Sequence, residues 1–398
     1  MTSPSPTQDA SLPEAEYLSG EVLLEEESFS WYSPSKFYAI HIGDIVESRY
    51  QVLAKLGYGS VSTAWLCKDM REDKYVTLKV YMTGHRQALN EAKVMNHLNS
   101  TPSDHPGAKL VRTMLDTFEI EGEHGKHVCM VYQPLSLSLR DIRTIAGGQV
   151  PAEILKPMLY AMLLALEYLH TVAHVVHTDI QDGNIMLSID DESIWDEALE
   201  GERQHPSPRK EVDGRTTYSS LEVDMPDDPG EPMICDFGDA QIGAGPFKIE
   251  VMPDLYRAPE IVLGIPWNEK IDIWAFGLMI WDLVQGKHLF NERLPTREAS
   301  AGTHLSKMIA LMGPPPPDLA ENAGVWDKFL DAEGCLNPGI KTFQGSLEDE
   351  DEIFEGDEKT AFLSFTRKML RWRPEDRLSA KELLEDSWLR GDWYGAKT

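Results

Sequence analysis

The chain has 398 residues, of which 66 are Asp or Glu and 37 are Lys or Arg, so its formal net charge at pH 7 is −29. Hydrophobic residues make up 42% of the chain, which excludes a wholly disordered protein. The excess of acid argues against nucleic-acid binding, which needs a basic face, and favours basic partners.

The cysteines and the apolar segments indicate the environment of the protein. Its four cysteines lie far apart and form no Cys-x-x-Cys pair, so we expect reduced thiols. The N-terminal segment lacks the positive charges of a signal peptide. The most apolar stretch, residues 158–176, carries Glu167 and two histidines, and it therefore predicts a buried helix with no membrane contact.

The first part of the chain is acidic and then becomes rich in short strands. Residues 1–30 contain three prolines and seven acids without a base, which predicts a disordered tail. Residues 31–49 are expected to form an ordered lead-in. A helix is expected from about Arg86 to Leu98. Alternating or β-branched patterns predict strands over 50–57, 62–69, 75–82, 109–120 and 126–133.

Helical periodicity dominates after residue 135. It predicts helices over residues 151–172, 270–285, 302–312, 359–370 and 380–388. Acids, Pro, Ser and Gly mark residues 189–231 as an insertion or long loop. We therefore predict an α+β fold with two lobes: a small β-rich lobe over 50–135, and a larger helical lobe over 136–390 that carries the insertion. Residues 391–398 are expected to form a C-terminal tail.

Two glycines and a lysine in the β-rich part could bind a phosphate. Gly57 and Gly59 join two predicted strands, where backbone amides can approach a phosphate closely. A hairpin that needs φ > 0 explains the same glycines. Lys79 lies in an otherwise apolar strand, and Glu91 lies on the apolar face of the following helix, so the two can form a pair. The alternative is a Lys that reaches solvent and a surface Glu.

The strongest pattern is His177-Thr178-Asp179-Ile180-Gln181-Asp182-Gly183-Asn184, followed after the insertion by Cys235-Asp236-Phe237-Gly238. Asp179 can accept a proton from a hydroxyl group. Asn184 and Asp236 supply the hard oxygen ligands that Mg²⁺ prefers. The sequence Tyr256-Arg257-Ala258-Pro259-Glu260 follows, and then the segment that begins at Asp272.

In this order the motifs resemble a eukaryotic protein kinase over about residues 50–390. The segments Ile42-Gly43-Asp44, Met130-Val131-Tyr132-Gln133-Pro134-Leu135 and His177-Thr178-Asp179, with the insertion, are similar to the SR-protein-kinase branch of the CMGC group, especially its fungal members. The resemblance implies a bilobal, monomeric, ATP- and Mg²⁺-dependent kinase. Its expected substrates are Ser/Thr in basic or Arg/Ser-rich proteins, and its expected location is the cytoplasm, with the nucleus as an alternative. Regulation of mRNA splicing is implied as well.

The resemblance also implies a role for individual residues. Asp179 would be the catalytic base, Lys79 would hold the ATP phosphates and be oriented by Glu91, and Asn184 and Asp236 would coordinate Mg²⁺. Glu260 would pair with an arginine late in the helical lobe, which we expect to be Arg377. The residues implied to surround the nucleotide are Leu56, Gly57, Gly59, Tyr132, the Gln133 carbonyl and the Leu135 amide.

Three positions and one segment depart from the family pattern. Thr178 replaces the arginine that pairs with an activation-loop phosphate, and no Ser or Thr lies between Asp236 and Glu260, so we expect no such switch. Gln181 replaces a lysine that touches the transferring phosphoryl, and Pro253 replaces a threonine linked to that lysine. Losing one such charge costs on the order of 2–4 kcal/mol unless it is replaced.

These departures leave two alternatives to a protein kinase. A pseudokinase that binds nucleotide or partners without efficient transfer is favoured by Gln181 and opposed by the complete set of the other site residues. A small-molecule phosphotransferase can share the His-x-Asp pattern, but Ala258-Pro259-Glu260 and the Asp272 segment argue against it.

Overall fold

The computed structural model describes residues 15–225, 230–291 and 297–395 of the chain. The chain divides into two compact units. The first unit comprises Met1–Leu89, Met114–Ser136 and Ile189–Pro229. The second comprises Asn90–Thr113, Leu137–Ser188 and Gly230–Thr398.

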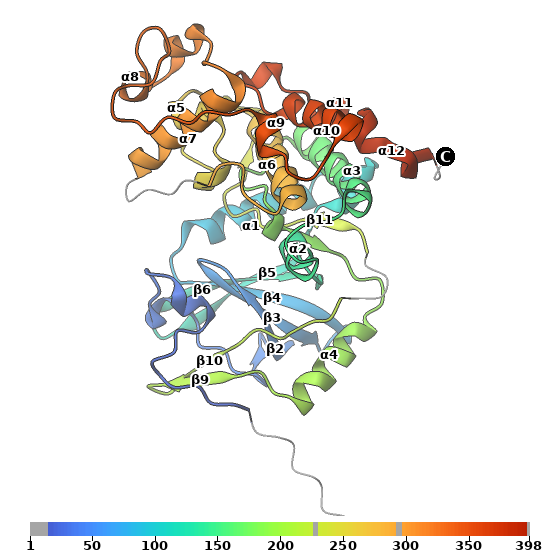
Figure 1. Ribbon diagram of the computed structural model, residues 1–398. Helices are drawn as coiled ribbons and strands as arrows, with labels where there is room; N and C mark the ends of the chain where they lie inside the picture. Colours follow the sequence, from blue (N-terminus) through green and yellow to red (C-terminus); the bar gives the residue numbers. More distant parts are fainter. Residues whose placement is uncertain (1–14, 226–229, 292–296, 396–398) are drawn as a thin grey trace, which may run out of the picture. The chain divides into compact units, whose positions relative to one another are not determined.

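A six-stranded antiparallel sheet forms the centre of the first unit (Figure 1). Its strands follow the order β1-β2-β3-β4-β6-β5. Val76, Leu78 and Val80 of β4 share one apolar cluster, and Lys79 points to the other face because side chains alternate along a strand. The strands are β1 (Ile45–Val46), β2 (Tyr50–Tyr58), β3 (Ser62–Asp69), β4 (Lys74–Tyr81), β5 (Met114–Gly122) and β6 (Gly125–Tyr132).

One predicted strand starts later than expected. The stretch from Lys109 was expected to be extended, but Pro106–Leu110 forms a 3-10 helix, η3, and β5 begins only at Met114. Pro106 stands at the first helical position, where its fixed φ favours a helical turn, and the His105 ring accepts a hydrogen bond from the Gly107 N–H. Local capping therefore outweighs the apolar pattern here.

Residues 15–30 are ordered, which corrects the expectation of a disordered tail; residues 1–14 lie outside the described residues. Helix η1 (Glu25–Ser28) presents its acids to a lysine of β2. The Lys55 Nζ lies 2.8 Å from Glu25 and 2.5 Å from Glu26, and Lys55 is only 1% exposed. A buried ammonium group needs such partners, so the acidic composition reflects pairing with buried bases.

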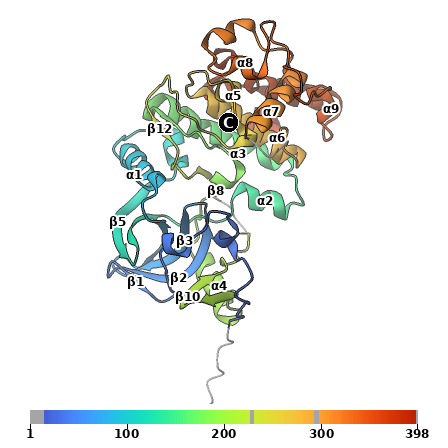
Figure 2. The same cartoon turned by 90° about the vertical axis from the view of Figure 1, so that its left-hand side faces the viewer.

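The insertion packs with the sheet, which corrects its assignment to the helical lobe. It contains helix α4 (Ser193–Gln204) and the hairpin of β9 (Arg209–Val212) and β10 (Arg215–Tyr218), and Figure 2 shows α4 and β10 beside β2. Trp195 of α4 is buried in an apolar cluster with Ala54 of β2 and Leu66 of β3. Burial of this large aromatic side chain holds an otherwise polar segment on the sheet.

The second unit is mainly helical, with α6 at its centre. Nearly every side chain of α6 (Lys270–Gln285) is buried, and Gly286 ends the helix with φ +71°. The other helices of at least seven residues are α1 (Arg86–Asn99), which begins in the first unit, α2 (Leu139–Ile145), α3 (Ala152–Tyr168), α7 (Arg297–Met312), α10 (Gly356–Met369) and α12 (Ser387–Gly395).

Shorter elements complete this unit. Helix α12 extends the helical part to Gly395, into the expected C-terminal tail, and a separate short helix precedes it. The short elements with a bearing on the site or on these boundaries are β7 (Val175–Val176), η5 (Asp182–Asn184), β8 (Ile185–Leu187), β11 (Pro232–Ile234), β12 (Gln241–Ile242), α5 (Pro259–Leu263) and α11 (Ala380–Leu383).

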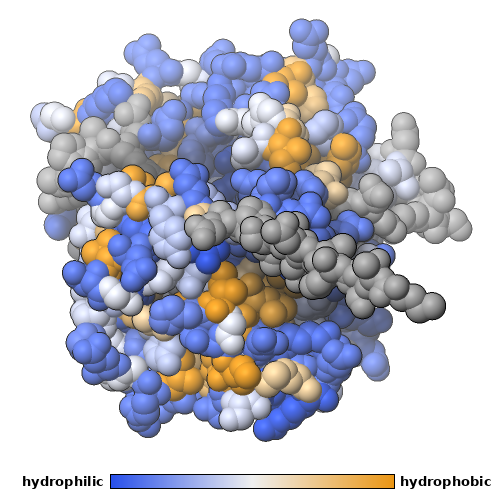
Figure 3. Space-filling view, turned by 90° about the horizontal axis from the view of Figure 1, so that it is seen from below, coloured by the Kyte–Doolittle hydropathy of each residue, from blue (hydrophilic) through white to orange (hydrophobic). Residues whose placement is uncertain are grey.

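The length of the helices and the polarity of the surface bear on membrane binding. Among the described residues, no helix has the length and apolar character that crossing a membrane requires. The face drawn in Figure 3 is largely hydrophilic, with hydrophobic residues in small groups. Small groups of this kind are normal on a folded protein and carry no argument for a partner.

We expect Lys55→Met to lower the free energy of unfolding by about 3–5 kcal/mol, because it leaves the carboxylates of Glu25 and Glu26 without their buried counter-ion. Urea denaturation of the full chain measures this change. Lys74→Met is the matched control, since Lys74 pairs with Glu72 at an exposed site and should change stability by less than about 1 kcal/mol. Equal effects of the two variants would contradict this account.

Candidate active site

The carboxylate of Asp179 is held at both of its oxygens by side chains of its own loop. The loop runs from β7 to β8 in the second unit and ends in the turn η5. The Gln181 Nε2 donates to Oδ1 of Asp179 at 2.7 Å, and the Asn184 Nδ2 donates to Oδ2 at 2.8 Å. Both donors act on the ionised form, so the loop is built around a carboxylate.

His177 connects this loop to the segment that carries Asp236. Its Nδ1 accepts a hydrogen bond from the Asp179 N–H at 3.2 Å, so its Nε2 bears the proton and donates to the Cys235 carbonyl at 3.0 Å. The side chain is fully buried, and burial lowers the pKa of His177. A neutral ring with this tautomer satisfies both contacts, so His177 acts as a structural link.

Asp272 of α6 fixes the backbone at the start of the loop. Its carboxylate accepts hydrogen bonds from the N–H groups of His177 and Thr178, both at 2.8 Å, and from the His170 Nε2 at 2.9 Å. Thr178 has φ +71°, an unfavourable conformation for a β-branched residue. The two backbone hydrogen bonds hold Thr178 in it, and Asp179 follows with its side chain directed toward Asn184.

Strand pairing places Asp236 next to Asn184. Strand β11, which leads to Asp236, pairs antiparallel with β8, which follows Asn184, and Ile234 is opposite Ile185. The Cys235 N–H donates to the Asn184 carbonyl at 2.8 Å. Asn184 and Asp236, which are 52 positions apart in the sequence, therefore meet at one end of a two-stranded sheet.

The electrostatics of the site follow from this proximity. Burial, and then repulsion by Asp236, raises the pKa of the Asp179 carboxyl to about 7, although the residue is still partly exposed. The hydrogen bonds from Asn184 and Gln181 act in the opposite direction. The site therefore concentrates negative charge, which favours a cation.

The donor set fits a hard divalent cation. Because the Asn184 NH₂ group is turned toward Asp179, its amide oxygen is directed elsewhere. Together with the exposed carboxylate of Asp236 it provides the oxygen donors that Mg²⁺ uses alongside phosphate and water. Among the described residues no group of three or more His, Cys, Asp and Glu side chains forms a metal site of the protein's own.

The first unit carries the other predicted nucleotide residues. Lys79 lies in β4 between Ala64 of β3 and Met130 of β6, and its Nζ is 4.9 Å from the centre of the Tyr81 ring. Tyr132, Gln133 and Leu135 lie at and after the end of β6; Tyr132 and Leu135 are buried and Gln133 is exposed. The structure thus places Lys79 and Tyr132 on neighbouring strands of one sheet, with Gln133 and Leu135 in the segment that follows β6.

The glycine turn connects β2 to β3. Gly59 closes it by donating to the Ser62 carbonyl at 2.8 Å. Neither Gly57 nor Gly59 has a positive φ, and a Cβ on Gly57 would meet nothing within 4 Å, so the conformation of the hairpin does not require glycine there. Leu56, at a register shift before the turn, packs against the apolar cluster around Trp195.

Glu91 and its neighbour lie on the part of α1 that belongs to the second unit. Glu91 is buried, as its position on the apolar face predicts. The Asn90 Nδ2 donates to the carbonyls of Gly238 and Ala240 at 3.0 and 2.9 Å. These bonds attach α1 to the segment after Asp236, and they were missed in the sequence because Asn90 gives no local signal.

Two charged residues around the loop have roles that no motif assigned. For Asp272 the sequence did offer a signal, which was an acid within the apolar run of α6. A buried acid needs several hydrogen-bond donors around it. Arg140 of α2 carried no signal. It lies against Asp182 and Gln181.

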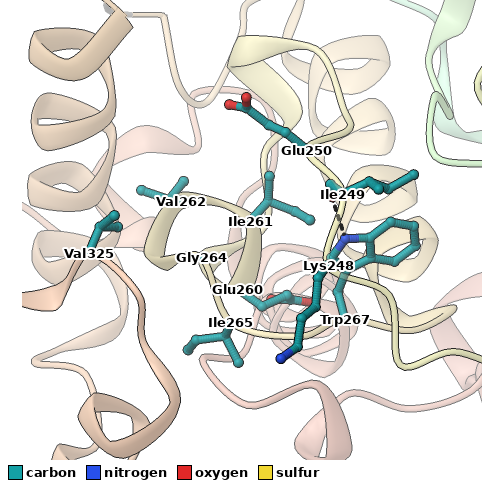
Figure 4. A pocket seen from close by; sticks show the side chains of 10 residues that line it. All are labelled: Lys248, Ile249, Glu250, Glu260, Ile261, Val262, Gly264, Ile265, Trp267 and Val325. Atoms are coloured by element: carbon teal, nitrogen blue, oxygen red, sulfur yellow. Dashed lines mark hydrogen bonds between the residues drawn. The ribbon is translucent and has the colours of Figure 1, made fainter.

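The expected pairing of Glu260 with Arg377 is confirmed, with oxygen–nitrogen distances of 2.7 and 2.6 Å between fully buried side chains. Next to this pair lies a pocket of about 250 Å³ (Figure 4). The Trp267 Nε1 donates to the Ile249 carbonyl at 2.8 Å and forms part of its wall. The lining residues are Lys248, Ile249, Glu250, Glu260, Ile261, Val262, Gly264, Ile265, Trp267 and Val325.

Comparison with known families identifies a protein kinase domain in the chain. The family model described as "Protein kinase domain" matches residues 50–389. A solved structure of a kinase domain superposes with a TM-score of 0.69 at 21% identity, and the match covers 89% of this chain and 98% of that chain. At this identity the superposition is evidence for the fold alone.

Several curated proteins are similar along nearly their whole length. A serine/threonine protein kinase of Aspergillus fumigatus is 40% identical, covering 97% of this chain and 96% of the relative. The serine/threonine-protein kinase SRPK of Physarum polycephalum is 28% identical, covering 92% and 91%. SRSF protein kinase 3 of Mus musculus is 25% identical, covering 92% and 90%.

We expect Asp272→Ala to lower the free energy of unfolding by about 3 kcal/mol, because it leaves the buried N–H groups of His177 and Thr178 without an acceptor. Thermal and urea unfolding measure the change. Asp318→Ala removes a carboxylate from an exposed pair with Arg373 and should cost less than about 1 kcal/mol. If Asp272→Ala is as stable as this control, the assigned role of Asp272 is wrong.

Proposed function

This chain belongs to the protein kinase family and is a serine/threonine protein kinase, and from that premise we propose that it transfers the γ-phosphoryl group of Mg²⁺-bound ATP to serines in basic, Arg/Ser-rich proteins. The observation that carries the proposal is the Asp179 carboxylate, held by Gln181 and Asn184 beside Asp236. A fixed proton acceptor next to oxygen donors for a cation is what phosphoryl transfer to a hydroxyl requires.

Each site residue has a proposed role in this reaction. Asp179 accepts the hydroxyl proton and orients the serine, and Asn184 and Asp236 hold Mg²⁺, which neutralises charge on the phosphates. In the first unit Lys79 binds the phosphates, with Glu91 of the second unit as its proposed partner. Gly57 and Gly59 cover the phosphates, and the open space beside Gly57 is consistent with close approach of a ligand. Leu56, Tyr132, Gln133 and Leu135 surround the adenine.

The proposed substrate class rests on charge and on the relatives. A net charge of −29 attracts cationic peptides and raises their association rate. Two similar proteins carry the names SRPK and SRSF protein kinase 3, which agrees with the resemblance to the SR-protein-kinase branch and supports Arg/Ser-rich substrates. We also propose that the chain acts as a monomer, in the cytoplasm or the nucleus, and that it takes part in regulating mRNA splicing.

We further propose that no phosphate is needed to order the segment between Asp236 and Glu260. Phe247 and Trp267 exchange two backbone hydrogen bonds of 2.8 and 2.9 Å, and their rings pack 4.7 Å apart. Arg257 pairs with Glu250 at 3.4 Å and with Asp254 at 2.9 Å. The Tyr256 hydroxyl, the segment's single hydroxyl in the sequence, is buried and donates to Asp282.

The proposed reaction predicts that the full chain phosphorylates an Arg/Ser-repeat peptide with Mg²⁺ and ATP, and that Asp179→Ala lowers the rate at least about 100-fold because the proton acceptor is lost. Radiolabel transfer measures both rates, and chelation of Mg²⁺ with EDTA should abolish the wild-type signal. The matched control peptide has glutamine in place of each arginine, and we expect it to react at least about tenfold more slowly.

The outcomes separate the alternatives. Transfer that survives Asp179→Ala would contradict the role of Asp179. Equal rates on the two peptides would contradict the Arg/Ser preference. Retained nucleotide binding without transfer by the wild type would instead favour the pseudokinase suggested by Gln181.

For the ordered segment, we expect protein made in bacteria and treated with a phosphatase to keep its full activity, since ion pairs within the chain already hold the segment. Mass spectrometry checks that the treated protein carries no phosphate, and initial rates before and after treatment should agree within about twofold. Activity that appears only after incubation with another kinase would overturn this expectation.

A further inference from the structure

Arg140 lies where it determines the orientation of the Gln181 side chain. Its Nη2 donates to the Gln181 Oε1 at 2.9 Å, and the Gln181 Nε2 donates in turn to the Asp179 carboxylate at 2.7 Å. A guanidinium has only donors, so the end of the glutamine amide that faces it must be the oxygen. The NH₂ end is thereby directed to Asp179.

Arg140 is itself positioned by helix α2. The helix begins with a capping box, in which the side chains of Ser138 and Asp141 bind each other's backbone N–H, and it buries Leu139 and Ile142. Arg140 and Arg143, three residues apart, then lie side by side on the neighbouring face of the helix. Both pair with the buried carboxylate of Asp182, at 2.9 and 3.1 Å.

The chain before α2 is also attached to the loop that carries Asp179. Ser138 forms a bridge with Met186 of β8, and the Leu187 N–H donates to the Leu137 carbonyl at 2.9 Å. These contacts set the start of α2 relative to the strand that follows Asn184. The guanidinium of Arg140 is thus fixed from its backbone as well as by Asp182.

Gly183 provides the space that the guanidinium occupies. A Cβ at this position would lie 2.8 Å from Cζ of Arg140 and 2.9 Å from its Nη2. Contacts this short do not occur, so any larger residue would displace the arginine side chain. The loop therefore accommodates Arg140 in three ways. Gln181 supplies a hydrogen-bond acceptor, Asp182 supplies a counter-ion, and Gly183 leaves the space for the side chain.

We propose that Arg140 is a positioning residue for phosphoryl transfer, which acts by fixing the Gln181 amide so that its NH₂ group holds the Asp179 carboxylate. Without Arg140 the amide oxygen loses the donor that holds it, so the Gln181 side chain can swing away and release the Asp179 carboxylate. The guanidinium of Arg140 also places a positive charge beside the loop. The inference rests on the proposed function, in which Asp179 is the proton acceptor.

The experiment compares variants of the full chain in single-turnover transfer to the peptide on which the wild type is active. Arg140→Met should slow the transfer roughly 10- to 100-fold, as loss of a residue that orients a catalytic group does. Calorimetric affinity for Mg²⁺·ADP should stay unchanged, and the midpoint of thermal unfolding should fall no further than it does in Arg143→Met, which also removes one partner of the Asp182 carboxylate. Arg143→Met, which removes a charge from the same Asp182 carboxylate, is the control and should change the rate by less than about twofold.

A double-mutant cycle and a second route to displacing Arg140 separate positioning from a general structural role. In a Gln181→Ala background, Arg140→Met should cost less than about twofold, since no amide is left to orient. Gly183→Ala should slow transfer as Arg140→Met does, and the two changes should not add.

Failure of this inference differs from failure of the proposed function. If the wild type transfers no phosphate, the proposed function is wrong. If the wild type is active and Arg140→Met matches it, or if the effect of Arg140→Met is the same with and without Gln181, the positioning role alone is wrong.

Discussion

The carboxylate of Asp272 is the interaction on which the rest of the site depends. It is a full charge inside an apolar helix, and it is tolerable there because two backbone N–H groups and the His170 ring donate to it. The same bonds hold Thr178 in a left-handed conformation. From that point His177 reaches both Asp179 and Cys235, so one buried acid fixes two segments at once.

The loop that carries Asp179 lacks a positive charge that the family resemblance implies, and the guanidinium of Arg140 from helix α2 lies beside it. The family resemblance implies a lysine at position 181, and the glutamine found there cannot repel Arg140, which a lysine would do. Asp182 then offsets the guanidinium and Gly183 leaves room for it. Gln181, Asp182 and Gly183 are therefore physically consistent with one another, which argues against simple decay of the loop and for a changed way of holding Asp179.

The N-terminal segment belongs to the unit that carries the glycine turn. The Trp31 Nε1 donates to the Ser60 carbonyl at 3.2 Å, and the Phe29 ring stacks on Trp31 and meets the edge of Tyr58. Lys55, a few residues before the turn, is held by the glutamates of η1. The acids near the start of the chain therefore support the strands around the turn.

Local patterns in the sequence predict the fold class and most strands and helices, because periodicity and short motifs show the local chemistry. The family and the pairing of Glu260 with Arg377 followed from the resemblance that the motifs carry, since these two residues lie far apart in the chain. Strand β3 and helix α6 were predicted with the same bounds that the structure has. The roles of Asp179, Asn184 and Asp236 in catalysis were also read from spacing, and they stay predictions that the arrangement of the loop supports.

The order of the N-terminal segment, the position of the insertion and the orientation of Gln181 became visible only in the folded chain. Acidic residues in a proline-containing segment predict disorder, and nothing local reveals that Lys55 and Lys210 are buried opposite them. The position of the insertion depends on the burial of Trp195, and the orientation of Gln181 depends on Arg140, 41 residues earlier in the chain. In each case a charged or aromatic side chain finds its partner through the folded backbone, and a contact of that kind leaves no periodicity or spacing in the sequence.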